Sequence, residues 1–198
     1  THLASSAASD VYKRQVMRVA AAAYPLDFLD DWAAYEVKMR RWVAEGAALG
    51  AGLVVFPEYG AMELATLAGR DVAGDLEASL HAVSNRLARA DALFAALAGD
   101  HGVHILAPSA PVFDGPGRPV NRARLFGPAG LIGHQDKQIM TRFEREEWDV
   151  IPGGPLTLFD TALGRIGILI CYDSEFPLLG RALAEADVIL VPSATEAL

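Results

Sequence analysis

Cys171 is the side chain of this sequence best suited to nucleophilic chemistry, and it is the only cysteine in the chain. Residues 166–170 before it are all apolar or glycine, a pattern typical of a strand buried on both faces. A helical pattern follows over residues 178–186. A thiol between a strand and a helix N-terminus lies near backbone N–H groups and the positive end of the helix dipole, so we expect a lowered pKa. Taken alone, Cys171 is equally compatible with an inert buried cysteine.

Two further reactive side chains follow predicted strands in the same way. Glu58 comes after the apolar residues 53–56, and Lys137 comes after a predicted strand at residues 131–135. Functional sites of open α/β sheets form at the carboxyl ends of the strands, so we expect Glu58, Lys137 and Cys171 to meet there. A carboxylate could take the thiol proton, an ammonium could stabilise an oxyanion, and the thiolate could attack an electrophilic carbon. Taken singly, the Glu and the Lys could be ordinary exposed residues.

Strand and helix patterns alternate along the chain that must position these three side chains. Short apolar runs predict strands at residues 16–24, 53–56, 103–107, 122–126, 131–135, 156–159, 166–170 and 188–191. Apolar residues three and four positions apart predict one helix that runs from Phe28 to Val43 and a longer one from Leu76 to Leu97. Residues 141–148 could form one or two helical turns. This alternation, with a hairpin across residues 127–130, predicts an α/β fold with mixed sheets.

The composition indicates a folded chain and excludes some partners. The 198 residues are 52% hydrophobic and 21% charged, and the formal net charge of −8 argues against nucleic acid or an anionic membrane as the main partner. One cysteine excludes an internal disulfide, and no signal-peptide core or membrane-length apolar segment is evident, so a cytoplasmic location is expected. Residues 1–15 are expected to be a disordered leader before one domain over residues 16–198.

Four segments of the chain resemble motifs of the nitrilase superfamily of carbon–nitrogen hydrolases. They are residues 54–58, 136–137 with 141–148, 164–173 with 176–177, and 187–193. The resemblance runs from about Val16 to the end of the chain. It implies a four-layer α-β-β-α sandwich with mixed sheets. It also implies a catalytic triad of Glu58, Lys137 and Cys171 that works without a cofactor.

The resemblance further implies a reaction and two more site residues. The reaction is hydrolysis of a small amide, carbamoyl compound or nitrile at its C–N bond, through a covalent cysteine intermediate. Glu144 is our choice for a second, substrate-positioning glutamate, with Glu146 and Glu147 as competitors on the same segment. The backbone N–H of Tyr172 should hold the oxyanion together with Lys137. No metal is expected, and a small-molecule substrate and a second copy of the chain, in a homodimer or larger homo-oligomer, are the expected partners.

Several alternatives remain open. Family members usually continue well beyond the strand at residues 188–191, so the C-terminal part of the sandwich is expected to be missing, and a truncated, non-catalytic binding subunit is one alternative. A papain-like hydrolase that pairs Cys171 with a histidine is another. The histidines are His2, His81, His101, His104 and His134, and none stands in a recognisable protease signature or completes a metal shell. Amide hydrolysis is preferred to nitrile hydrolysis by analogy alone.

Overall fold

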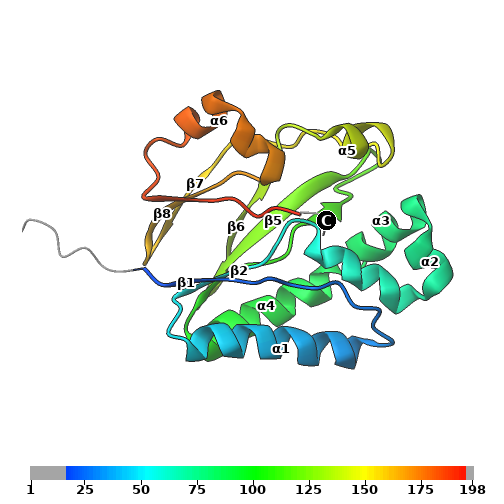
Figure 1. Ribbon diagram of the computed structural model, residues 1–198, viewed down its shortest axis with the longest axis horizontal. Coiled ribbons are helices and arrows are strands. Elements are labelled where there is room, and N and C mark those ends of the chain that lie inside the picture. Colours follow the sequence, from blue (N-terminus) through cyan, green and yellow to red (C-terminus); the bar gives the residue numbers. More distant parts are fainter. Residues whose placement is uncertain (1–16, 195–198) are drawn as a thin grey trace, which may run out of the picture.

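The computed structural model describes residues 17–194, which form two β-sheets packed between helices (Figure 1). The strands are β1 (Val19–Ala21), β2 (Leu53–Val55), β3 (His104–Leu106), β4 (Ala110–Val112), β5 (Val120–Gly127), β6 (Gly130–Asp136), β7 (Leu158–Thr161), β8 (Gly164–Ile168) and β9 (Val188–Leu190). The helices are α1 (Trp32–Ala48), α2 (Arg70–Gly74), α3 (Leu76–Ser84), α4 (Leu87–His101), α5 (Arg142–Glu146) and α6 (Pro177–Ala182), with 3-10 helices η1 (Gly60–Ala68) and η2 (Cys171–Glu175).

Both sheets contain parallel and antiparallel strand pairs, as the sequence predicts. In the first sheet β1, β2 and β3 are parallel, whereas β5 pairs antiparallel with β3, β4 and β6. β3 and β4 follow one another along the same edge of β5, where Ile105 lies opposite Phe126 and Ala110 lies opposite Arg122. In the second sheet β8 pairs antiparallel with β7 and parallel with β9. The carboxyl ends of β2 and β8, from the two different sheets, both lead into the candidate site.

The four-layer α-β-β-α sandwich expected from the sequence is confirmed. Helices α1 and α4 cover the outer face of the first sheet, where Met39 and Phe94 are fully buried (Figure 1). The inner face packs on the second sheet through a core that includes Leu125 and Ile168, and burial of each such side chain contributes about 1.5–3 kcal/mol. Leu183, just after α6, lies against Gly167 on the far face of the second sheet. The two sheets are therefore held face to face by apolar packing.

The structure corrects two helix boundaries. The predicted helix from Leu76 to Leu97 is in fact two helices, α3 and α4, which separate at Asn85 and Arg86. The apolar spacing continues across the break because both helices contribute to the same core. The prediction that Phe28 belongs to the first helix is also wrong. This helix starts at Trp32, where the Asp31 carboxylate accepts the Ala34 N–H at 2.8 Å, and Phe28 is 42% exposed.

The structure also adds elements that the sequence did not predict. These are β4, η1, α2 and η2. β4, α2 and η2 have only three to five residues, too few to show a period, and η1 is a 3-10 helix, which does not have the 3.6-residue spacing of an α-helix. The helical pattern over residues 178–186 corresponds to α6 (Pro177–Ala182), so the element that begins at Cys171 is the 3-10 helix η2 rather than an α-helix. The predicted leader, residues 1–15, lies outside the described residues. Within the described part of the chain, no helix has the length and apolar character needed to cross a bilayer.

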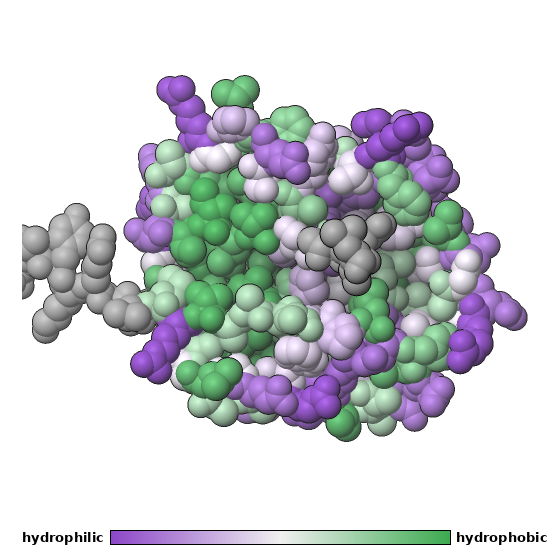
Figure 2. Space-filling view, viewed as in Figure 1, coloured by the Kyte–Doolittle hydropathy of each residue, from purple (hydrophilic) through white to green (hydrophobic). Residues whose placement is uncertain are grey.

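Apolar residues gather on one face of the molecule, the face on which β1 and the last strand lie (Figure 2). β1 and β9 are edge strands of their sheets among the described residues. Val19 in β1 is 47% exposed, and Ile189 in β9 and Val191 just after it are 36% and 42% exposed. Edge strands with exposed apolar side chains have free main-chain groups with which further β-structure can pair.

Candidate active site

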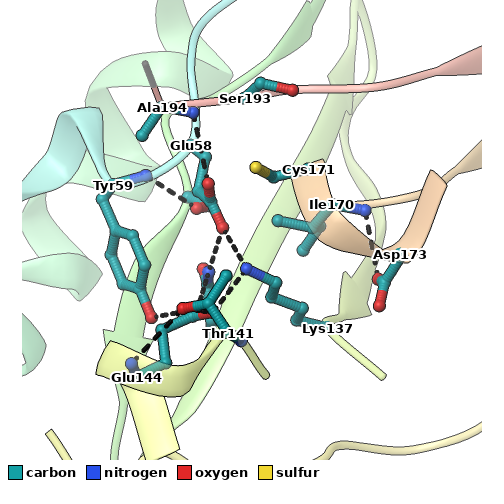
Figure 3. Close-up of polar contacts among 12 residues, drawn as sticks. Glu58, Tyr59, Lys137, Thr141, Glu144, Ile170, Cys171, Asp173, Ser193 and Ala194 are labelled. Atoms are coloured by element: carbon teal, nitrogen blue, oxygen red, sulfur yellow. Dashed lines mark hydrogen bonds and ion pairs between the residues drawn. The ribbon is translucent and has the colours of Figure 1, made fainter. Parts of the chain in front are cut away.

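Glu58, Lys137 and Cys171 come together at one end of the sandwich, as the sequence predicts (Figure 3). Glu58 follows β2, Lys137 follows β6 directly, and Cys171 follows β8. All three line one cavity of about 350 Å³, together with Tyr59, Glu144 and Trp148. Glu58 and Lys137 follow strands of the first sheet and Cys171 follows a strand of the second, so each sheet contributes part of the site.

Lys137 is a buried ammonium held between two carboxylates. Its Nζ donates to Glu58 Oε1 at 2.7 Å and to Glu144 Oε2 at 2.6 Å, and the residue is only 1% exposed. The Asn121 side-chain amide bridges the same two carboxylates, at 3.0 Å from Glu58 Oε1 and 3.2 Å from Glu144 Oε1. Burial by itself would lower the pKa of Lys137, but the charges and hydrogen bonds of Glu58 and Glu144 outweigh it and raise that pKa. Lys137 therefore stays protonated and can act only as a donor.

The structure brings Glu144 to this cluster and leaves its two competitors outside. Glu144 is 3% exposed and lies in α5, where its carboxylate accepts the Thr141 N–H at 2.8 Å in a capping box. Glu146 and Glu147 are exposed. Burial works against ionisation of Glu144, but the ammonium of Lys137 and the surrounding hydrogen bonds together lower its pKa. Glu144 therefore neutralises part of the Lys137 charge and fixes its position.

Cys171 occupies a left-handed backbone conformation at the start of η2. Its φ is 50°, which costs a non-glycine residue about 1–3 kcal/mol unless the surroundings hold it. The Cys171 N–H donates to the Pro192 carbonyl at 2.9 Å, which fixes this turn to the segment after β9. Figure 3 shows the sulfur directed towards the Glu58 carboxylate, whose Oε1 accepts from the Lys137 ammonium. The strained turn therefore presents the thiol to the cavity.

The expected lowering of the Cys171 pKa is not found. Burial raises the pKa of the thiol, and the charge and hydrogen bond of Glu58 raise it further, against the opposing charge of Lys137. The helix dipole has little influence because η2 contains only five residues. The resting sulfur is consequently a thiol, which needs a base before it can attack.

Asp173 ties the lysine segment to the cysteine segment, and the sequence analysis gave it no such role. Its fully buried carboxylate accepts the N–H groups of Gln138 at 3.1 Å, Ile139 at 2.8 Å and Ile170 at 3.2 Å. Burial raises the pKa of Asp173, although these amides act in the opposite direction. This one side chain therefore links the residues just after Lys137 to the residue just before Cys171.

Asp173→Ala should therefore destabilise the fold by about 2–4 kcal/mol, because one buried and two partly buried amides lose their acceptor. Asp173→Asn is the matched control, since it keeps one carbonyl oxygen and should lose less. Urea denaturation followed by circular dichroism measures both. An Asp173→Ala variant within about 0.5 kcal/mol of the wild type would contradict this role.

The backbone after β9 also reaches the site. The Ala194 N–H donates to Glu58 Oε2 at 3.2 Å, on the carboxylate oxygen that Lys137 does not bind (Figure 3). Tyr172 is the second residue of η2, and the amides on either side of its own are engaged, by Pro192 and by Ile170. None of the histidines within residues 17–194 lines the cavity, and His2 lies outside the described residues.

Tyr59 and Asn121 are site residues that sequence reasoning missed. Tyr59 adopts a φ of 51°, and its hydroxyl donates to Glu144 Oε1 at 2.8 Å. Burial, followed by the nearby carboxylate of Glu144, raises the pKa of Tyr59, so its hydroxyl remains a donor. No sequence pattern identifies Asn121. The spacing of Thr141 and Glu144, a Thr three residues before a Glu, is a capping-box signature that could have distinguished Glu144 from its neighbours.

A four-layer α-β-β-α sandwich with a glutamate, a lysine and a cysteine at one cavity is what the sequence resemblance to the nitrilase superfamily implies. The family model described as "Carbon-nitrogen hydrolase" matches residues 18–196. The chain therefore belongs to the carbon–nitrogen hydrolase family, as the sequence resemblance predicts.

Known relatives and solved structures agree with this assignment. The chain is 41% identical over 106 residues to the probable hydrolase YhcX of Bacillus subtilis, covering 52% of this chain and 20% of that protein. It is 31% identical over 159 residues to the bifunctional nitrilase/nitrile hydratase NIT4A of Nicotiana tabacum, covering 74% of this chain and 44% of that protein. The chain thus spans less than half the length of these two relatives.

The fold is shared with solved carbon–nitrogen hydrolases. A carbon–nitrogen hydrolase from Helicobacter pylori G27 superposes with a TM-score of 0.68 at 20% identity, over 91% of this chain and 60% of that one. An amidase from Nesterenkonia sp. superposes with a TM-score of 0.64 at 24% identity, over 91% of this chain and 66% of that one. These likenesses extend over nearly the whole described part of the chain.

Proposed function

We propose that the protein hydrolyses the C–N bond of a small amide or carbamoyl compound through a thioester on Cys171. The observation that carries this proposal is the single cavity lined by Cys171, Glu58 and Lys137. The Cys171 sulfur has a raised pKa and lies beside the Glu58 carboxylate. A protonated nucleophile next to a dedicated base requires this arrangement.

The first half of the reaction forms the thioester. Glu58 takes the Cys171 proton as the sulfur attacks the carbonyl carbon, and the carbonyl oxygen becomes an oxyanion. Lys137 uses two of its three N–H bonds on the carboxylates, so one remains for the oxyanion, with the Tyr172 N–H as the second donor. Such donors are each worth about 3–4 kcal/mol at the transition state. Protonated Glu58 then gives its proton to the leaving nitrogen, and ammonia or an amine departs.

The second half releases the acid. Water attacks the thioester carbon while Glu58 accepts a proton from it, and the same two donors hold the second oxyanion. The S–C bond breaks, the Cys171 sulfur recovers the proton from Glu58, and a carboxylic acid leaves. Glu144 keeps Lys137 in place during both halves through the hydrogen bond between Lys137 Nζ and Glu144 Oε2. One molecule of water is consumed for each amide cleaved.

Nitrile hydrolysis is the second candidate, because the tobacco relative is named a bifunctional nitrilase/nitrile hydratase. Attack of the thiolate on a nitrile carbon would use the same base and the same donors. A cytoplasmic location, a homo-oligomeric assembly and a cofactor-free reaction stay predictions from the sequence.

Intact-mass spectrometry after incubation with amides, carbamoyl amino acids and nitriles tests the proposal. The expected result is an acyl adduct mapped to Cys171. The class of compound that produces the adduct shows whether the substrate is an amide or a nitrile. Monodisperse protein that forms no adduct and turns over no compound would instead favour a non-catalytic binding subunit.

The raised pKa of Cys171 predicts how alkylation depends on pH. The midpoint of the iodoacetamide rate profile should lie above the value of about 8.5 for a free cysteine, since deprotonation is shifted to higher pH. Glu58→Gln should lower this midpoint, because the Glu58 charge raises the thiol pKa. Lys137→Met should raise it, because the ammonium lowers that pKa. The same sign of shift in both variants would contradict the assigned electrostatics.

A further inference from the structure

Three aromatic side chains supply most of the cavity lining beyond the charged cluster and Cys171. The rings of Tyr59 and Trp148 pack edge to face, with centroids 4.8 Å apart and an interplanar angle of 72°. Phe143 packs on Trp148 in the same way, at 5.3 Å and 67°. Such pairs are stable and present a stiff apolar surface. Phe143 lies in α5 and is 51% exposed, so the aromatic lining extends from the interior of the cavity to solvent.

The charges that line the cavity do not favour a negatively charged substrate. Among the described residues, Lys137 is the only cation in the lining, and it already binds Glu58 and Glu144. One positive and two negative groups leave a net charge of −1 when both carboxylates are ionised. Two arginines of α5, Arg142 and Arg145, lie outside the lining, are largely exposed and pair with Glu146.

A carboxylate on the substrate would therefore meet a net negative charge with no free cation to pair with. Transfer of an ionised carboxylate into a partly dry, like-charged cavity is strongly unfavourable. An alkyl group would instead bury apolar surface against the three rings. The volume of about 350 Å³ is at the lower end of the range for ligand cavities, which limits the size of that group.

We infer, on the basis of the proposed function, that the site selects amides with a small, neutral and apolar acyl group, and that Phe143 and Trp148 determine this selectivity. Amides whose acyl group carries a carboxylate are rejected. The aromatic lining holds the acyl chain while its carbonyl carbon lies at the Cys171 sulfur.

A pair of matched alkylating probes tests the charge selectivity independently of turnover. Iodoacetamide and iodoacetate transfer the same carbon to sulfur, forming an S–C bond as iodide leaves, and they differ only in the neutral amide and the carboxylate. Their rate ratio at Cys171 should exceed the ratio for N-acetylcysteine at the same pH by about 30-fold. Both probes react with the same thiolate fraction, so the pKa of Cys171 cancels. A ratio equal to that of N-acetylcysteine would overturn the inference.

Two substitutions at Phe143 form the matched pair of variants. Phe143→Lys places a free cation at the mouth of the cavity and should lower the probe ratio about tenfold. Phe143→Leu keeps an apolar side chain and should leave the ratio within about threefold of the wild type. Phe143 is half exposed, so neither change should unfold the protein. An unchanged ratio in Phe143→Lys would count against the role of Phe143.

Two amides of equal chain length test the same selectivity in the reaction. Succinamate has a carboxylate where butyramide has a methyl group, and kcat/KM should be at least about 100-fold higher for butyramide. Trp148→Leu should raise KM for butyramide more than KM for acetamide, with kcat little changed. Trp148→Phe keeps an aromatic ring and should bring KM for butyramide back towards the wild-type value.

The two possible failures are distinguishable. Failure of the proposed function would appear as no turnover of any amide while the probe ratio remains high. Failure of the selectivity would appear as succinamate turned over as fast as butyramide.

Discussion

Cys171→Ala should lower kcat/KM for amide hydrolysis by at least about 10⁴-fold while leaving the fold intact, because no covalent intermediate can form. Cys171→Ser should lose nearly as much. A serine hydroxyl is much harder to deprotonate than a thiol, and the base beside it is a carboxylate rather than a histidine. Steady-state kinetics with butyramide, together with circular dichroism spectra of both variants, measure the effect.

The fold control matters because Cys171 occupies a strained turn. With φ at 50°, the residue is held by its N–H bond to the Pro192 carbonyl and by the packing around η2, and neither needs the sulfur. The free energy of unfolding of both variants should therefore lie within about 1 kcal/mol of the wild-type value. A fully active Cys171→Ser variant would exclude the thioester scheme.

Lys137→Met should cause the second large effect, on stability and on activity together. It leaves the carboxylates of Glu58 and Glu144 buried without their shared cation, which should cost about 3–5 kcal/mol of stability. It also removes one of the two proposed oxyanion donors, which should lower kcat by about 10²–10³-fold. Urea denaturation and kinetics at neutral pH measure the two losses.

A double variant separates the two losses. Lys137→Met with Glu144→Gln removes one of the two unpaired charges, so stability should recover in part while activity should not. Glu146→Gln is the matched control, since Glu146 lies in the same helix but is exposed and pairs with arginines. Equal stability of the single and the double Lys137 variants would contradict the predicted cost of leaving the Glu144 carboxylate buried without its cation.

Much of the fold could be predicted because its determinants are local in the sequence. The strands that lead to Glu58 and Cys171 are continuous apolar runs, and the hairpin of β5 and β6 has a turn between two strand patterns. The break between α3 and α4 was missed because the residues on both sides face one core, and the apolar spacing does not change there. Phe28 was misassigned because its spacing fits the helix, whereas the Asp31 cap decides where the helix starts.

The three reactive residues were predictable, but their chemical environment was not. Their types and their positions after strands indicated a shared site. The sign of the Cys171 pKa shift depends on how deeply the sulfur is buried and on which side Glu58 lies, and a linear pattern contains neither. Asp173 and Asn121 act through contacts with segments far along the chain, and only the folded structure shows these contacts.

The bond between Ala194 and Glu58 joins residues 136 positions apart. Contacts of such high sequence separation close late in folding, because a long loop must be ordered before they form. During synthesis on the ribosome, Glu58 emerges early, and its contact with Ala194 can form only after almost the whole described chain has been translated. Glu58 receives the hydrogen bond of Ala194 only when the residues after β9 have been added, so a nascent chain that stops before this strand lacks that contact at the candidate site.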